Sequence, residues 1–163
     1  MTPDSPNIIR FITETNDDNF QKFMRGHLYL EALLGEIIER SFSTPAALDR
    51  VAAMFFNKVK LVRALGRLDD REEELLLAVN AVRNKLAHKL EFSLTFETAF
   101  ALLSKAQAAG VDFSDDGIFD HEWAEKNYGV FGVISEVISN TFQHIVWQNE
   151  DLLSEQGIGE LLR

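Results

Sequence analysis

The chain has 163 residues, no cysteine and a formal net charge of −10. A chain of this length can bury about 70% of its unfolded surface in one core, so a single domain needs neither disulfides nor a metal to fold. The lack of cysteine excludes disulfides, thiolate nucleophiles and cysteine-ligated zinc, and the acidic balance opposes nonspecific binding to nucleic-acid phosphates.

Apolar residues recur three and four positions apart along the chain, and alternation with period two is nearly absent. This pattern predicts an all-α fold, which we expect to be one antiparallel bundle of five to six helices spanning 1–163. We expect 1–16 and 155–163 to be loosely ordered ends. The expected helices cover 17–42, 45–54, 56–65, 69–88, 95–110 and a final helix that starts near 121 or 128 and runs to 153.

Capping residues mark several of these helix ends. The expected start signals are Asp17 or Asp18, the Ser43-Thr44-Pro45 sequence, Asp69 or Asp70 followed by three glutamates, and Thr95 with Thr98 at the capping-box position. Gly66 and Gly110 are expected to end two helices. Gly26 and Gly35 interrupt the first helix at positions where a neighbouring helix could approach closely.

The N-terminus shows no basic stretch followed by an apolar run, so we do not expect a secretory signal. No segment approaches the roughly 18 uninterrupted apolar residues of a membrane span. These observations predict a cytoplasmic protein that does not cross a membrane.

One stretch of the chain is basic. Residues 56–90 hold eight basic and five acidic side chains. The formal net charge of this stretch is therefore +3, and that of the rest of the chain is −13. Lys60, Arg63 and Arg67 are spaced to share a helix face, and they are the candidates for an anion-binding site. A solvated charged stripe explains the same spacing.

Two short segments resemble metal sites but lack a ligand. Residues 112–120 place oxygen side chains as a calcium loop does, but the twelfth position is Trp123 and Glu122 is out of register by one residue. Residues 121–125 begin like the zinc-protease signature, whose second histidine is replaced here by Glu125. We therefore predict no metal site and no cofactor.

His27 could pair with Glu31 one turn away, and His144 lies near the packed face of the last helix. We expect both to be structural histidines that are hydrogen-bonded within the fold, and not metal ligands.

The segment Arg83-Asn84-Lys85-Leu86-Ala87-His88 has the clearest chemical content. Arg83 could hold a phosphate in bidentate fashion, and His88 could exchange a proton near neutral pH, which suits metal-free RNA cleavage. Five residues on an ideal helix separate two side chains by about 140°, whereas Asn84 and His88 are nearly superposed. A catalytic site would therefore need a distorted helix end near Ala87, or a second subunit. In the structural alternative, Arg83 pairs with a carboxylate, Asn84 bonds to a neighbouring helix, and His88 caps the helix C-terminus.

The order of these motifs resembles the HEPN superfamily, and within it the mannitol operon repressor-like proteins. The residues that carry the resemblance are Arg25-Gly26, the segment 56–66, and Arg83, Asn84 and His88, and it spans roughly 23–96. Lys58 departs from the pattern, which has an apolar or small residue there, and the C-terminal half has no recognisable signature.

The resemblance implies a helical regulatory protein that forms a homodimer and acts through contacts with a protein partner. It also implies the site residues Arg83, Asn84 and His88. The HEPN superfamily also includes RNA-cutting toxins. A metal-independent endoribonuclease with RNA as its substrate is therefore the alternative. A direct DNA-binding repressor is the third interpretation, opposed by the charge and by the lack of a basic recognition helix.

Overall fold

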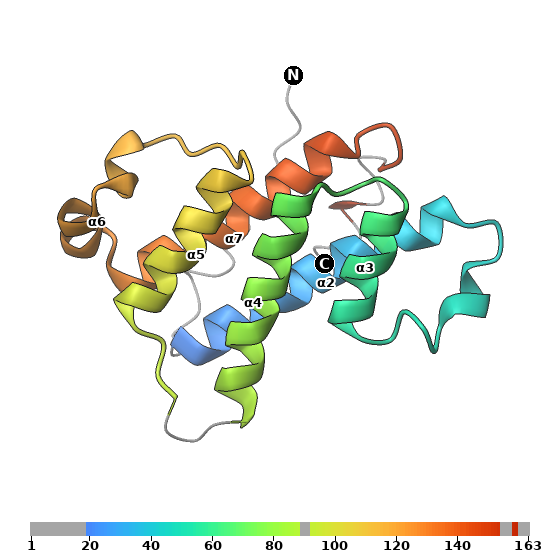
Figure 1. The fold of residues 1–163 in the computed structure, drawn as a ribbon, viewed down its shortest axis with the longest axis horizontal. Coiled ribbons are helices and arrows are strands. Elements are labelled where there is room, and N and C mark those ends of the chain that lie inside the picture. The colour runs from blue at the N-terminus through green and yellow to red at the C-terminus, as the bar shows by residue number, and fades with distance from the viewer. Residues whose placement is uncertain (1–18, 89–91, 154–157, 160–163) are drawn as a thin grey trace.

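The computed structural model describes residues 19–88, 92–153 and 158–159, and in this part of the chain it contains α-helices and no strand. Six α-helices pack together into a single domain, which confirms the all-α prediction (Figure 1). The helices are α2 (Asn19–Ser41), α3 (Phe55–Ala64), α4 (Asp70–His88), α5 (Phe96–Ala108), α6 (His121–Asn127) and α7 (Gly129–Gln148), with 3-10 turns at Pro45–Leu48 and Asp116–Phe119. The expected ends 1–16, the caps Asp17 and Asp18, and nearly all of 155–163 lie outside the described residues.

Helix α2 lies at the centre of the packing, against α3, α4 and α7, while α5 packs on α4 and α7. Its buried stripe includes Phe23, Leu30 and Leu34, each with no exposed surface. Gly26 lies at a close approach of α2 to α7, because a Cβ added there would be 2.6 Å from Cδ1 of Ile138. The predicted close approach at this glycine is confirmed.

The caps that precede α4 and α5 are those predicted. The Oδ1 atom of Asp69 accepts hydrogen bonds from the backbone N–H groups of Arg71 and Glu72, at 2.9 and 2.8 Å. The side chain of Glu72 accepts in return from the N–H of Asp69 at 2.7 Å, which completes a capping box. Thr95 accepts from the N–H of Thr98 at 3.2 Å.

The prediction of a helix over 45–54 is wrong. The chain forms only the 3-10 turn Pro45–Leu48, and Thr44 makes no side-chain capping bond. No residue of this turn is buried. A short helix is marginal in water unless an apolar face packs against its surroundings, so the favourable Pro45 start does not propagate.

The last helix is shorter than predicted and starts after a break. Tyr128 lies between α6 and α7, and Gly129, the first residue of α7, has a φ of +65°, which residues other than glycine rarely adopt. Helix α7 ends at Gln148 rather than residue 153. The amide of buried Asn149 donates to the carbonyl oxygen of Ile145 at 2.9 Å, and the chain turns there.

Among the described residues, no helix combines the length and the apolar character that a membrane crossing requires.

Candidate functional site

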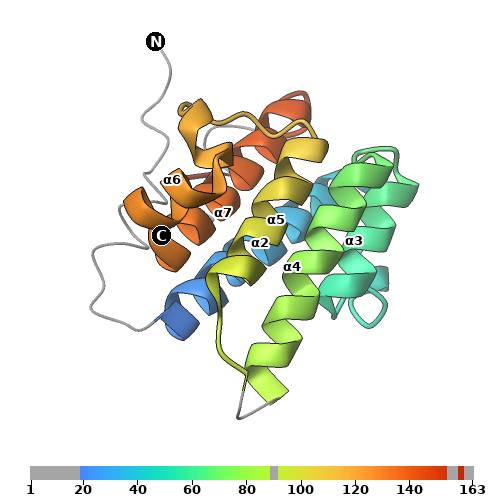
Figure 2. The same ribbon diagram turned by 60° about the vertical axis from the view of Figure 1, so that its left-hand side comes forward.

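The segment that carries Arg83 to His88 forms the last turns of α4. These turns extend past the neighbouring helices in both ribbon views (Figure 2). Asn84, Lys85, Ala87 and His88 are exposed, and Arg83 is half-buried. The projecting end of α4 therefore presents most of the motif to solvent.

The Arg83 guanidinium makes few polar contacts within the described part of the chain. Its Nη1 atom donates to Oδ1 of Asn84 at 3.1 Å, and its Nε atom is buried without a hydrogen-bond partner. No described carboxylate forms an ion pair with Arg83. The predicted alternative, in which Arg83 pairs with a carboxylate, is therefore not found among these residues, and the guanidinium keeps capacity for an anion.

His88 lies on another side of α4 from Arg83. The helix continues without interruption through His88, so the distorted end near Ala87 that a one-chain catalytic pair requires is not present. Five residues of regular helix turn the two side chains by about 140° relative to each other. One copy of the chain does not bring Arg83 and His88 together.

A partly buried polar contact lies one turn before Arg83. The Nε2 atom of His27 on α2 lies 3.1 Å from Oδ1 of Asn80 on α4, and the centroid of its ring lies 4.2 Å from that of Phe55 of α3, with the rings tilted by 33°. Burial lowers the pKa of His27, and the charges of Arg83 and Lys58 lower it further, against the opposite effects of Asn80 and Glu31. No sequence signal indicated this contact, because His27 and Asn80 are 53 residues apart.

The interpretation of His27 as a structural histidine is consistent with this contact, but Glu31 is not its hydrogen-bond partner. Glu31 accepts a bond from Lys58 of α3 at 2.9 Å instead. His144 lies 2.7 Å from the buried Glu72 carboxylate, so it ties α7 to the first turn of α4.

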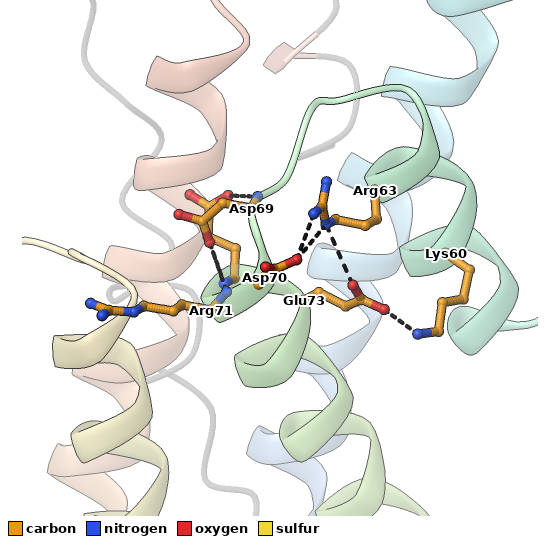
Figure 3. Close-up of polar contacts among 7 residues, drawn as sticks. Lys60, Arg63, Asp69, Asp70, Arg71 and Glu73 are labelled. Atoms are coloured by element: carbon orange, nitrogen blue, oxygen red, sulfur yellow. Dashed lines mark hydrogen bonds and ion pairs between the residues drawn. The ribbon is translucent and has the colours of Figure 1, made fainter.

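The three anion-binding candidates all contact carboxylates of the same chain, and Figure 3 shows the contacts of Lys60 and Arg63. Lys60 bonds to Glu73, and Arg63 bonds to Asp70 at 2.5 Å and approaches Glu73 at 3.5 Å. Arg67 reaches both carboxylate oxygens of Asp151, at 2.7 and 2.8 Å. An incoming anion would have to displace these partners.

The Arg67 contact also perturbs its partner, since the hydrogen bond from the guanidinium lowers the pKa of Asp151. The pair joins the loop after α3 to the turn that follows α7.

The acidic loop after α5 uses its carboxylates as caps. Asp115 accepts from the N–H of Gly117 at 2.8 Å and from the hydroxyl of Tyr128 at 2.9 Å. Asp120 accepts from the N–H of Trp123 at 2.8 Å and so starts α6. Nowhere in the described residues do three or more histidine or carboxylate side chains converge as a metal would require.

His121, the first residue of the zinc-like sequence, lies 2.8 Å from Glu97 and packs edge-on against Phe96. It therefore joins α6 to α5.

Comparisons of the chain with protein families, curated proteins and solved structures found no match. The interpretation of the α4 end accordingly depends on its own chemistry.

Proposed function

We propose that this chain is a helical regulatory protein that acts by binding other protein chains, a second copy of itself included, through the projecting end of α4. This is the function that the resemblance to the mannitol operon repressor-like proteins implies. The observation that carries the proposal is the pairing of Lys60, Arg63 and Arg67 with carboxylates of the same chain.

Binding to DNA draws most of its affinity from lysine and arginine side chains that displace counterions from phosphates. In the one basic stretch of this sequence, these three cations are already neutralised, and Arg71 donates to the carbonyl oxygen of Ala108. Arg83 and Lys85 remain as described cations at the end of α4. Two cations beside exposed Asn84 and His88 suit a local contact with a carboxylate of a protein partner better than a track of phosphates.

The first test is the assembly state, measured by light scattering after size exclusion. We expect a dimer that is weakened at least about tenfold by Ala87→Arg, because an added long cation on an exposed interface position must be desolvated or displaced. Ala101→Arg is the matched control, since Ala101 is an exposed alanine on α5. A monomeric wild-type chain, or equal effects of the two substitutions, would contradict the proposal.

The second test is fluorescence anisotropy with duplex DNA at about 50 mM and about 200 mM salt. We expect no binding at either concentration. Binding that falls steeply with salt would show a phosphate-contacting surface and would favour the DNA-binding repressor instead.

A second candidate function is metal-independent cleavage of RNA, and one observation favours it. Arg83 is not neutralised by a described carboxylate, whereas Arg63 and Arg67 are. Because His88 of the same copy faces elsewhere, the active pair would be Arg83 of one subunit and His88 of the other.

The reaction on such a pair needs no metal or cofactor. The ribose 2′-oxygen attacks the adjacent phosphorus, the bond to the 5′-oxygen breaks, and the products are a 2′,3′-cyclic phosphate and a 5′-hydroxyl end. His88 transfers the proton, and Arg83 stabilises the charge that develops on the phosphoryl oxygens.

This candidate is tested by incubating single-stranded RNA with the protein and a chelator. Arg83→Ala and His88→Ala would each abolish cleavage, and Lys85→Ala, an exposed cation of the same turns, would not. Mixing the two inactive variants is the decisive step, because a mixed dimer with shared sites contains one intact Arg83–His88 pair and regains part of the activity. Intact RNA after incubation with the folded wild-type dimer would exclude this candidate.

A further inference from the structure

His27 has surroundings that differ from those of the other histidines. It is the most buried of the four, with 3% of its surface exposed, and it lies where α2, α3 and α4 meet. His121 and His144 each face a carboxylate, at 2.8 and 2.7 Å. His88 is exposed at the end of α4. Each of these three histidines therefore faces either a carboxylate or solvent.

The charged groups that act on His27 are Glu31 of α2, Lys58 of α3 and Arg83 of α4. Glu31 already forms an ion pair with Lys58 at 2.9 Å, so these two charges largely offset each other. Arg83 has no such partner in the described part of the chain. A proton on His27 would therefore add a buried positive charge beside an uncompensated one, which is costly in a poorly solvated site.

We infer that buried His27, at the meeting point of α2, α3 and α4, is an acid-sensitive attachment of α4 to α2. It holds the Arg83 to His88 end in place while the imidazole is neutral, and it loosens that end when His27 gains a proton, because the hydrogen bond to Asn80 does not offset the loss of solvation of the buried charge. Asn80 lies one helical turn before Asn84, so a shift of α4 at this contact moves the turn that carries Arg83. The consequence for activity rests on the proposed function of the α4 end, but the attachment itself does not.

The direction of the pH effect follows from the burial of His27, which lowers its pKa in the folded chain below the ordinary value of 6.5. The unfolded chain then binds a proton at a higher pH than the folded chain does. The stabilisation by neutral His27 is therefore complete above about pH 6.5. It is lost as the pH falls through the lowered pKa that His27 has in the folded chain.

The test combines imidazole titration by NMR with thermal unfolding between about pH 7.5 and about pH 5. We expect His27 to titrate below about pH 6.5, and the amide signals of 80–88 to shift with the same midpoint. The unfolding temperature of the wild-type chain should fall over this range more steeply than that of His27→Gln, whose amide can donate to Asn80 but takes up no proton. His88→Gln is the matched control and should retain the wild-type slope.

A second variant applies if His27→Gln does not fold. Asn80→Asp replaces the amide by a carboxylate at the same position, so it should raise the titration midpoint of His27 and reduce the loss of stability on acidification. A His27 midpoint at or above about pH 6.5 in the wild-type chain, or equal slopes for His27→Gln and His88→Gln, would overturn the inference.

These outcomes are separable from those of the proposed function. A monomeric chain in which His27 titrates at low pH would support the attachment and contradict the regulatory dimer. A dimer in which His27 titrates at its ordinary pH would support the dimer and contradict the attachment.

Discussion

Replacing Gly26 by alanine tests whether the contact between α2 and α7 is as tight as the structure has it. An added Cβ would lie 2.6 Å from Cδ1 and 3.0 Å from Cγ2 of Ile138, a side chain that is only 1% exposed. Relief of this overlap requires a shift of several tenths of an ångström in a packed core, and such overpacking costs about 1–3 kcal/mol.

The same substitution also has a favourable component, because alanine is better than glycine by about 1 kcal/mol inside a helix. Gly35→Ala isolates that component, since the nearest atom to its added Cβ is Cε of Lys58 at 3.9 Å, an ordinary contact. We therefore expect Gly35→Ala to stabilise the protein by about 0.5–1 kcal/mol. The difference in unfolding free energy between the two variants should equal the overpacking cost, about 1–3 kcal/mol.

The measurement is urea unfolding followed by circular dichroism. Ile138→Val removes the Cδ1 atom and should recover part of the loss in the Gly26→Ala background while destabilising the wild-type chain by about 0.5–1.5 kcal/mol. If Gly26→Ala proves as stable as Gly35→Ala, the close approach at Gly26 is refuted.

Three further changes test local contacts. Burial, then the hydrogen bond to Asp115, raises the pKa of Tyr128 to about 12, so in a Tyr29→Phe background Asp115→Asn should lower the midpoint of an alkaline absorbance titration without returning it to 10; an unchanged midpoint would show that the bond is not formed. Thr95→Ala should cost about 1 kcal/mol in chemical unfolding through loss of the α5 cap, and no loss would mean that Thr95 does not cap the helix. Glu72→Ala removes a buried carboxylate that accepts bonds from the first turn of α4 and from α7, and should cost about 1.5–3 kcal/mol; a loss below about 0.5 kcal/mol, typical of surface sites, would contradict that role.

The helix ends that sequence predicted correctly are those with local chemistry. The side chains of Asp69 and Thr95 bond to backbone groups two or three residues ahead, so the signal and the structure lie in the same short segment. The start at Pro45 has a similar signal but no helix, because nothing in Pro45–Leu48 is buried. A capping signal needs an apolar face that packs before it yields a stable helix.

The candidate site was predictable in composition but not in arrangement. Arg83, Asn84 and His88 were recognised by type and spacing, and regular helix geometry already placed Arg83 and His88 on different sides. That Arg83 would lie near His27, and that Arg67 would be neutralised by Asp151, depends on residues 56 and 84 positions away. No local pattern specifies such pairs.

The sequence by itself determined the helical class, the positions of most helices and the polar character of the α4 end, because hydrophobic periodicity and caps act between residues a few positions apart. The tertiary structure decided which charges are neutralised and which are not. The sequence made Lys60, Arg63 and Arg67 candidates for an anion-binding site, but packing brings carboxylates to all three. Arg83 lies near buried His27 and bonds to Asn84 of its own helix, and no carboxylate of the described residues forms an ion pair with it.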